Sequence, residues 1–385
     1  MSSATENISK LSPAQLEGLL RHLKKGKNGS PILGPLAKTK QNRVPFSVAR
    51  HGNFALEIGK PGIIDSLEFH VSSRAAPEAG EVEIEIYAAG LNFRDVMIAL
   101  GMYPSTGGET PKMGGELSGK IVAVGEGASD FQVGDEVMAT APGAFRAFVT
   151  TSIEGVVKKP PALTFEMAAG IPAVFVTCIY SLRHLAHLGK GERILIHSAA
   201  GGVGLSAIQI AQSTGAEIFA TVGTPEKRQF IESLGINHIM NSRSLGFVED
   251  VMRVTHGEGV DVILNSLAGE AIPKGLEILR PYGRFIELGK RDLMENRQIG
   301  LLPFGKGISF ASVDLSWLYA LRPGLTRVMF EEIVQGLVAG IFKPLPTRFF
   351  PISEAPKAFS YMARGTHIGK IVLLVKGQEL LIAET

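Results

Sequence analysis

The sequence predicts an α/β protein built from a doubly wound parallel sheet and a second, β-rich domain. Its 385 residues allow two or three domains at ~150 residues each. Between residues 194 and 288, short apolar runs recur with helical stretches between them, which is the pattern of buried parallel strands. Residues 81–87 instead alternate polar and apolar side chains with period two, as half-buried strands do.

Taken in order, the segments predict that the doubly wound domain interrupts the β-rich one. Residues 12–23 suggest one short amphipathic helix that begins at Ser12 and Pro13, and a linker-like segment follows it. A docking role and a solvated tail are both open for this helix. We expect a tail with this helix over 1–45, the first part of the β-rich domain over 46–165, the doubly wound domain over 166–325, and a return to the β-rich domain over 326–385.

Composition excludes several classes of protein. Lys and Arg exceed Asp and Glu by only two (39 − 37), so there is no large basic field for nucleic acid or a membrane surface. The single cysteine, Cys178, excludes a disulfide framework and a cysteine-based structural zinc site. No uninterrupted run of ~18 apolar residues occurs, and residues 1–6 lack the start of a secretory signal. We therefore expect a cytoplasmic protein with neither a nucleic-acid partner nor a membrane partner.

The most informative segment is a glycine-rich turn that joins a predicted strand to a predicted helix. Ala199, Gly201 and Gly204 occupy the positions of an A-x-G-x-x-G dinucleotide fingerprint, and Gly202 and Val203 complete the turn. Missing side chains there let the backbone approach a pyrophosphate at the N-terminus of the helix. Such a turn can serve packing alone, but the strand, the helix and the repeated α/β pattern together favour a Rossmann-type dinucleotide site.

The next strand favours NADPH over NADH. It ends without the carboxylate that would take the ribose hydroxyls of NAD. Thr224 follows its end, and Lys227 and Arg228 come next. A hydroxyl and two cations suit a 2′-phosphate of roughly −2 charge. The alternative is an ordinary helix start with a solvated cationic face.

Seven sequence strings carry a resemblance to a known family. They are residues 89–96, 100–104, 114–116, 133–137, 199–204, 265–268 and 287–293. The chain resembles the zinc-independent branch of the medium-chain dehydrogenase/reductase superfamily, specifically the enoyl reductase domains of polyketide synthases and animal-type fatty acid synthases. The resemblance covers roughly residues 46–378. It implies a Rossmann domain, a split GroES-like catalytic domain, and an active site in the cleft between them.

The resemblance also shows that this chain lacks the zinc-ligand histidine of its zinc-dependent relatives. Zinc-dependent relatives carry a Gly-His-Glu segment, whereas this chain has Gly114, Gly115 and Glu116. The resemblance therefore implies no metal site, and Glu116 is expected to be a structural carboxylate.

The resemblance also implies which residues bind the cofactor. Asn92 is expected near the nicotinamide ribose and Thr177 near the nicotinamide. The others are Thr224, Lys227 and Arg243 around the 2′-phosphate, and Asn265 and Leu288 along the nicotinamide end. For Arg243, a loop cation without a ligand is the alternative.

Three residues are candidates for handling protons. Lys290 resembles the cleft lysine of the family and Asp314 its acidic partner. A positioned ammonium can donate a proton or orient a water, and a carboxylate can hold it in place. Tyr103 resembles a tyrosine that some polyketide enoyl reductases use in α-protonation. The alternatives are a structural ion pair for the first two and a hydrophobic plug for Tyr103.

Other polar residues are expected to be structural. His197 is predicted to be a satisfied buried histidine and Cys178 a core residue. Arg94 and Asp95 are predicted to form an internal pair.

The predicted function is NADPH-dependent reduction of the α,β-double bond of an enoyl thioester. The resemblance places the substrate on the phosphopantetheine of an acyl carrier protein, among neighbouring polyketide synthase domains. Hydride would go to the β-carbon, and protonation at the α-carbon would follow. A free quinone or alkenal reductase, reductive cyclopropane formation from a γ-halogenated substrate, and a non-catalytic NADPH-binding protein are alternatives. Both a monomer and a homodimer are open.

Overall fold

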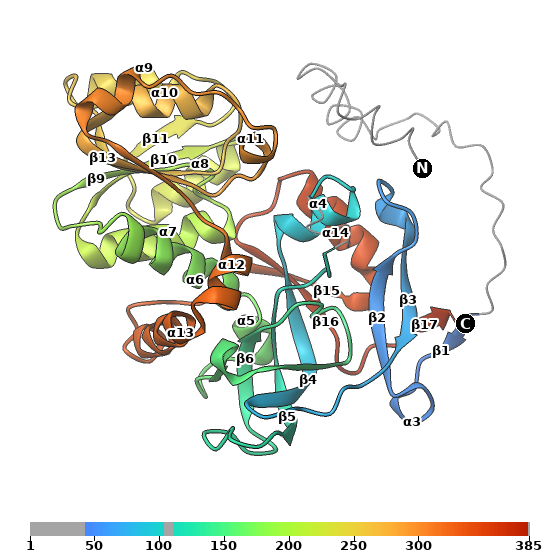
Figure 1. Ribbon diagram of the computed structural model, residues 1–385. Coiled ribbons are helices and arrows are strands. Elements are labelled where there is room, and N and C mark those ends of the chain that lie inside the picture. Colours follow the sequence, from blue (N-terminus) through green and yellow to red (C-terminus); the bar gives the residue numbers. More distant parts are fainter. Residues whose placement is uncertain (1–42, 104–110, 384–385) are drawn as a thin grey trace, which may run out of the picture.

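The fold of the chain is known from a computed structural model that describes residues 43–103 and 111–383 (Figure 1). The expected helix near Ser12 lies outside these residues. A parallel sheet with its helices forms one lobe, and two further sheets form the other.

The first sheet has six parallel strands and is buried on both faces. Ile194 and Ile196 of its central strand point into one hydrophobic cluster, whereas Leu195 between them points into another. The sheet is therefore covered by helices on both sides, which confirms the doubly wound fold. Its strands, in spatial order, are β11 (His238–Asn241), β10 (Glu217–Val222), β9 (Arg193–Ile196), β12 (Val260–Asn265), β13 (Leu279–Glu287) and β14 (Ser309–Ser312).

The second sheet takes strands from both ends of the described chain. Val82, Ile84 and Ile86 of its long strand β4 are buried, at 0%, 0% and 1% exposure, as the period-two pattern predicts. Its path is β15 (Thr347–Pro351), β16 (Lys370–Leu374), β4 (Glu81–Leu91), β5 (Glu116–Val124), β6 (Glu136–Thr140) and β8 (Val156–Lys158), and β7 (Phe148–Ser152) also pairs with β4. Because β15 and β16 follow the parallel sheet in the chain, the β-rich domain is split as expected.

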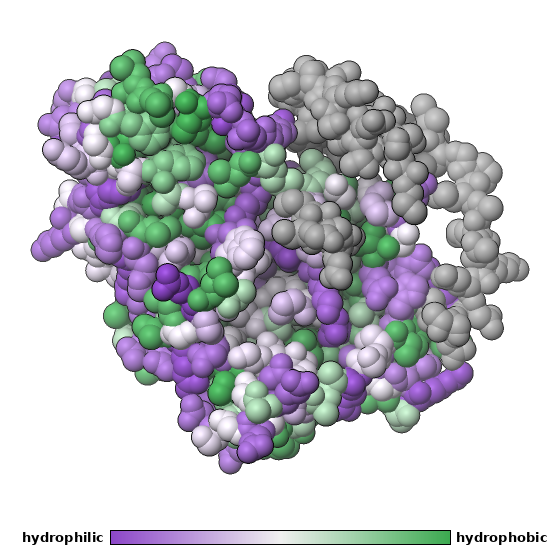
Figure 2. All heavy atoms as spheres, in the orientation of Figure 1, coloured by the Kyte–Doolittle hydropathy of each residue, from purple (hydrophilic) through white to green (hydrophobic). Residues whose placement is uncertain are grey.

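The third sheet is small and joins the first and last described strands. Its order is β1 (Arg43–Pro45), β17 (Leu381–Ala383), β3 (Leu67–Ser72) and β2 (Asn53–Ile58). On the face shown in Figure 2, hydrophilic and hydrophobic residues are interspersed over both lobes.

The helices have the following bounds. The α-helices are α3 (Val48–His51), α4 (Phe93–Ala99), α5 (Phe165–Ala168), α6 (Pro172–Ile179), α7 (Gly202–Thr214), α8 (Pro225–Ser233), α9 (Phe247–Val254), α10 (Ala271–Glu277), α11 (Arg291–Met294), α12 (Leu315–Leu321), α13 (Pro323–Val338) and α14 (Ala355–Ala363). The short helical segments are η1 (Ile64–Ser66), η2 (Ile153–Gly155), the π-helical η3 (Tyr180–Leu185), η4 (Leu302–Lys306) and η5 (Ile352–Glu354).

The helical run Phe165–Leu185 is long and apolar enough, on average, to cross a membrane. However, 67% of its most apolar window is buried inside the protein. That burial is typical of a core helix of a globular domain.

Two of the expected domain boundaries fall inside helices. The 165/166 boundary lies within α5, and the 325/326 boundary lies within α13. Helix α13 packs against both α6 and β8, so it contacts both lobes. The division of the chain into domains stays a prediction.

The two lobes meet at the glycine-rich turn. The N–H of Gly369, just before β16, donates to the carbonyl of Ala200 at 2.8 Å, and Gly201 and Gly369 form a β-bridge. Nearby, the Nζ of Lys227 donates to the carbonyl of Gly365 at 2.8 Å. The return segment of the β-rich domain is thus fastened to the parallel-sheet domain at two places.

Candidate active site

The glycine-rich turn connects β9 to α7 and leaves the start of the helix open. Gly201 is the N-cap of α7, and no side chain caps the helix. A Cβ on Gly204 would lie 2.5 Å from the Cα of Ala199, so only glycine lets the turn close on itself there. A Cβ on Gly201 would have only the Ser198 carbonyl within 4 Å. The first N–H groups of a helix have no acceptor within it, so this backbone fits a pyrophosphate.

Polar groups around the turn add to the site. Ser198 has a left-handed φ of 53°, and the Ser266 hydroxyl lies 3.1 Å from its hydroxyl. The Nδ1 of His197 lies 3.0 Å from the hydroxyl of Thr221, whereas its Nε2 is buried without a partner among the described residues. Burial lowers the pKa of His197 to about 3, so the ring is neutral. The expectation of a buried histidine is confirmed, but the expectation that it is fully satisfied is wrong.

The structure brings the three expected 2′-phosphate residues to the ends of β10 and β11. The Thr224 hydroxyl caps α8 by accepting the N–H of Lys227 at 3.3 Å. Burial, and then the charge of Arg243, lowers the pKa of Lys227. A Cβ on Gly223 would lie 2.7 Å from the Nε of Arg243, so the guanidinium folds back over this turn. Arg228 is not part of the group, since its guanidinium approaches Glu232 at 3.9 Å along α8.

Asn265 and Leu288 lie together at the ends of β12 and β13. Asn265 is fully buried, and its amide donates to the Leu267 carbonyl at 2.7 Å and to the Glu287 carboxylate at 2.6 Å. The N–H of Leu288 donates to the Asn265 carbonyl at 2.9 Å. Because both amide hydrogens of Asn265 are bonded to the protein, its side chain orders this loop.

Glu287 is a buried acid bonded to Asn265, and the sequence did not single it out. It is 1% exposed, and burial raises its pKa to about 7, although hydrogen bonds from Asn265 and the N–H of Gly289 oppose the rise. An acid at the end of the apolar run 284–288 was the available signal.

Thr177 lies one turn into α6. Its hydroxyl donates to the Ala173 carbonyl at 2.6 Å, and the residue is half-buried. The Thr177 hydroxyl oxygen can still accept a hydrogen bond from another group.

Lys290 and Asp314 form the expected pair. Their charged atoms lie 2.9 Å apart, and the side chains are 24% and 30% exposed. Lys290 also donates to the Val313 carbonyl at 2.7 Å, so two of its three N–H groups are used and one remains. Burial alone would raise the pKa of Asp314, but the hydrogen bond and charge of Lys290, with backbone N–H donors, hold it below its ordinary value.

Tyr103 is not in contact with that pair. Its ring is partly buried against the core of the β-rich domain, and the Arg94 guanidinium lies 5.0 Å from the ring centroid. Within residues 43–103 and 111–383, no hydrogen bond or ion pair joins Tyr103 to Lys290 or Asp314.

The expected pair of Arg94 and Asp95 does not form. Asp95 accepts the N–H groups of Asn92 and Gly114 at 2.9 and 2.8 Å, whereas Arg94 donates to the Lys112 carbonyl at 3.3 Å. Asp95 closes the start of α4, a local role that its place three residues after Asn92 explains.

Asn92 belongs to a buried cluster with Glu116 and Lys370. The Nζ of Lys370 donates to Glu116 at 2.6 Å and to the Asn92 amide oxygen at 2.8 Å. The Asn92 amide donates to Glu116 at 2.8 Å. Lys370 was missed in the sequence, where the signal was a lone lysine at the start of the apolar strand 370–374.

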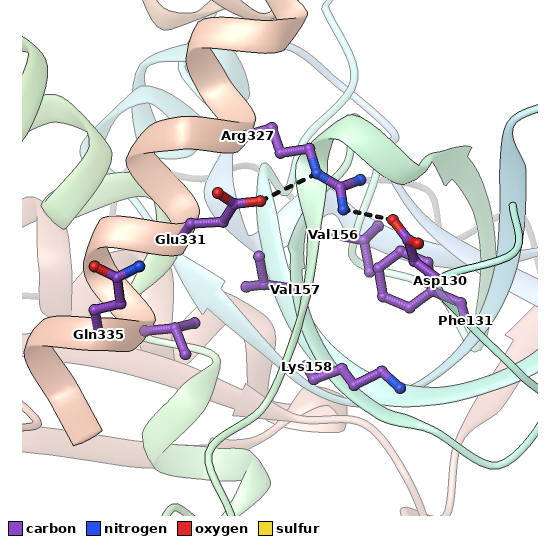
Figure 3. Close-up of a pocket in the computed structure, with 9 residues that line it drawn as sticks. Asp130, Phe131, Val156, Val157, Lys158, Arg327, Glu331 and Gln335 are labelled. Carbon is purple, nitrogen blue, oxygen red and sulfur yellow. Dashed lines mark hydrogen bonds and ion pairs between the residues drawn. The ribbon is translucent and has the colours of Figure 1, made fainter.

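A cavity of about 290 Å³ lies elsewhere, between α13 and β8 (Figure 3). Arg327 on its wall bonds Asp130 at 2.6 Å and Glu331 at 3.3 Å. None of the sequence-predicted site residues lines it.

Comparisons with known proteins bear on both lobes. Residues 78–169 match the alcohol dehydrogenase GroES-like domain family, and residues 234–373 match the zinc-binding dehydrogenase family. The chain is 45% identical to CurK enoyl reductase, whose crystal structure matches with a TM-score of 0.76 over 84% of this chain and 99% of that one. This chain is a zinc-independent medium-chain dehydrogenase/reductase that resembles polyketide synthase enoyl reductases.

Other members of the family extend the comparison. The CurF ER cyclopropanase from the curacin A pathway is 36% identical, with a TM-score of 0.78 over 84% of this chain and 99% of that chain. The Escherichia coli quinone oxidoreductase, solved with NADPH, is 26% identical, with a TM-score of 0.75 over 84% and 100% of the two chains. A phenolphthiocerol/phthiocerol polyketide synthase polypeptide of Mycobacterium tuberculosis is 42% identical over 320 residues. The match covers 83% of this chain but about 15% of that much longer protein.

Membership of this family makes the chain an oxidoreductase with a nicotinamide cofactor, and the turn at Gly201 and Gly204 fits that cofactor. No group of three or more His, Cys, Asp or Glu side chains in the described part of the chain is arranged to hold a metal ion. Glu116, beside the position of the zinc-ligand histidine in zinc-dependent relatives, is bonded to Lys370.

Cys178 is a core residue as expected. It is buried, its thiol donates to the Val203 carbonyl at 3.1 Å, and burial raises the pKa of the thiol.

Proposed function

We propose that this protein is an NADPH-dependent enoyl reductase, which reduces the α,β-double bond of an enoyl thioester on an acyl carrier protein during polyketide synthesis. The observation that carries the proposal is the pair of Lys290 and Asp314. It lies at the carboxyl edge of the nucleotide sheet, partly exposed, with one lysine N–H still available. The resemblance to CurK enoyl reductase supports the substrate class, and the polyketide synthase relatives support an acyl carrier protein and neighbouring synthase domains as partners.

The proposed reaction has a hydride-transfer step and a proton-transfer step. NADPH, when bound, supplies the hydride to the β-carbon. The electron pair of the double bond then moves toward the thioester oxygen, and the α-carbon must take a proton. In this proposal the Lys290 ammonium, which is bonded to Asp314 and the Val313 carbonyl, supplies that proton directly or through a water. Tyr103 is the second candidate for the donor.

The preference for NADPH rests on Thr224, Lys227 and Arg243 at the ends of β10 and β11. We expect NADPH to be turned over with higher kcat/KM than NADH. Arg243→Ala should reduce that ratio about tenfold, since a charged hydrogen bond to phosphate is lost. Arg228→Ala is the matched control, because Arg228 lies on α8 facing Glu232. Equal efficiency of the wild type with the two cofactors would remove the preference.

A panel of substrates tests the activity itself. We expect reduction of a crotonyl group on a carrier protein, measured by NADPH consumption and product mass, and little reduction of quinones or free alkenals. The reverse order would make the protein a free quinone or alkenal reductase. Stoichiometric NADPH binding without turnover on any substrate would make it a non-catalytic NADPH-binding protein.

Ring closure is a second candidate function, favoured by the similarity to the CurF ER cyclopropanase. After hydride addition, the enolate carbon would displace a γ-halide, so that a cyclopropane ring forms and the halide leaves. A γ-halogenated enoyl thioester separates the two outcomes by mass. Simple reduction keeps the halogen and adds two hydrogens, whereas ring closure loses the halogen and adds one hydrogen.

A further inference from the structure

Lys370 is a buried lysine at the junction of the two lobes. Its side chain is 3% exposed, and that of its partner Glu116 is 0% exposed. All three N–H groups of its ammonium are bonded to protein: to Glu116 at 2.6 Å, to the Asn92 amide oxygen at 2.8 Å and to the Leu91 carbonyl at 3.1 Å. The ammonium has no remaining donor for a substrate, so its effect must act through the groups that it holds.

One of those groups is the Asn92 carboxamide, whose orientation the cluster fixes. The amide oxygen accepts from Lys370, and the amide nitrogen donates to Glu116 at 2.8 Å. The flipped amide would place a donor against the ammonium and an acceptor against the carboxylate, which is unfavourable. The second N–H of the Asn92 amide can then donate a hydrogen bond to a group outside the cluster.

The cluster also fixes two other parts of the candidate cofactor site. The second oxygen of Glu116 accepts the N–H of Ala173 at 2.8 Å, at the start of α6, the helix that carries Thr177. On the other side, the aliphatic part of Lys370 lies against the glycine-rich turn, since a Cβ on Gly202 would be 2.7 Å from its Cδ. The residue before it, Gly369, is bonded to Ala200. A single ion pair thus sets Asn92, α6 and the turn relative to one another.

We propose that Lys370 is a positioning residue for the nicotinamide half of the cofactor. Its ammonium sets the direction of the Asn92 carboxamide and, through Glu116, the start of α6. The inference rests on the proposed function only in taking the glycine-rich turn, Asn92 and the start of α6 as parts of the cofactor site. The 2′-phosphate group of residues, at the ends of β10 and β11, has no bond to the cluster in the part of the chain that the structure describes.

The test compares a whole dinucleotide with a fragment that lacks the nicotinamide half. Binding to the full chain is titrated by cofactor fluorescence or calorimetry for NADPH and for 2′,5′-ADP; if the wild type binds NADH more tightly, NADH and ADP are used. The variants are Lys370→Met, Lys370→Arg and Asn92→Ala. Lys376→Met is the matched control, because Lys376 lies close by in the sequence and its ion pair with Glu85 of β4 is more exposed than that of Lys370.

We expect Lys370→Met and Asn92→Ala to weaken dinucleotide binding about tenfold. Fragment binding should change by less than about twofold, because Thr224, Lys227 and Arg243 make no hydrogen bond to Lys370, Glu116 or Asn92 in the described part of the chain. Lys370→Arg should restore part of the loss, and Lys376→Met should change neither the dinucleotide affinity nor the fragment affinity.

Equal weakening of dinucleotide and fragment binding would show a general structural role and overturn the proposal, as would unchanged binding of both. If Lys370→Met does not fold, Lys370→Arg compared with the wild type gives the decision: weaker dinucleotide binding with unchanged fragment binding supports the proposal, and equal weakening of both or no change in either overturns it. Because these are binding measurements, they stay informative if no enoyl thioester is reduced.

Discussion

Two lysine–carboxylate pairs, Lys370 with Glu116 and Lys290 with Asp314, belong to the candidate site, and they differ in burial. Lys370 and Glu116 are 3% and 0% exposed, and every donor of the lysine is bonded to protein. Lys290 and Asp314 are 24% and 30% exposed, and one donor of the lysine remains. This difference underlies the two proposals above, in which the buried pair orders the site and the more exposed pair supplies a proton.

The physical reason is the cost of burying charge. A buried ammonium is tolerated only when its charge is paired and its donors are satisfied, so its geometry is fixed. A pair that still reaches solvent contributes little stability, but it can lose and regain a proton. The predictions below test this contrast, from the largest expected effect to the smallest.

Loss of the buried pair should cost the most stability. Lys370→Met leaves the Glu116 carboxylate buried and without its cation, so we expect the free energy of unfolding to fall by about 3–5 kcal/mol. Lys290→Met should cost about 1 kcal/mol or less. Urea denaturation of both variants measures the difference. Adding Glu116→Gln to Lys370→Met should recover part of the loss; similar losses for the two lysines would contradict the contrast.

Loss of the exposed pair should instead reduce turnover. We expect Lys290→Met to lower kcat for a carrier-bound enoyl substrate by about 10²-fold or more, as removal of a general acid does. Lys274→Met, which removes an exposed ion pair with Glu277 on α10, is the control and should be unaffected. A wild-type rate for Lys290→Met would leave this pair a purely structural role.

Glu287 extends the contrast to a buried carboxyl whose hydrogen-bond donors are amides. Its pKa is raised from 4.5 to about 7, so the folded protein binds the proton more tightly than the unfolded chain does. The stability that this gives is full below pH 4.5 and is lost as the pH rises through about 7. At ~1.36 kcal/mol per pKa unit, the loss is up to about 3 kcal/mol.

Denaturation of the wild type and of Glu287→Gln at pH 4.5 and pH 8 measures this loss. The wild type should lose stability relative to the variant as the pH rises. A parallel pH dependence of the two proteins would show that Glu287 titrates normally.

Tyr103 should have the smallest effect on rate. Its ring packs on the core and beside Arg94 and makes no hydrogen bond to Lys290 or Asp314 in the described residues, so we expect Tyr103→Phe to change kcat by less than about tenfold. If its phenol nevertheless delivers the α-proton, the face of deuterium incorporation from D₂O should change with an α-substituted substrate. Unchanged rate and stereochemistry would remove Tyr103 from the mechanism and leave Lys290 as the donor.

The sequence predicted the fold well where side-chain periodicity depends on local burial. The run 194–196 is apolar at every position because both faces of the parallel sheet are covered, and β4 alternates around Val82, Ile84 and Ile86 because its two faces differ. Helices α5 and α13 cross two of the expected domain divisions, and α13 contacts both lobes, so the division of the chain stays a prediction.

Local geometry was predictable where one short segment or one pair of residues carries the pattern. The turn from Ala199 to Gly204 lies at the start of α7, as its spacing predicts, and Lys290 and Asp314 lie 2.9 Å apart as their resemblance implies. The predicted pair of Arg94 and Asp95 does not form, because each side chain bonds a different part of the backbone.

By itself, therefore, the sequence determined the doubly wound sheet and the glycine-rich turn, because each depends on spacing within a short stretch of chain, whereas the family followed from a resemblance carried by seven separate strings. Only the tertiary structure decided what Lys370 and Glu116 do, since the two residues lie 254 positions apart in the chain. A charge in an apolar strand is unfavourable until its partner is known, and that partner comes from a different strand of the folded sheet. The roles of the two lysine pairs follow from burial, and burial is a property of the folded protein.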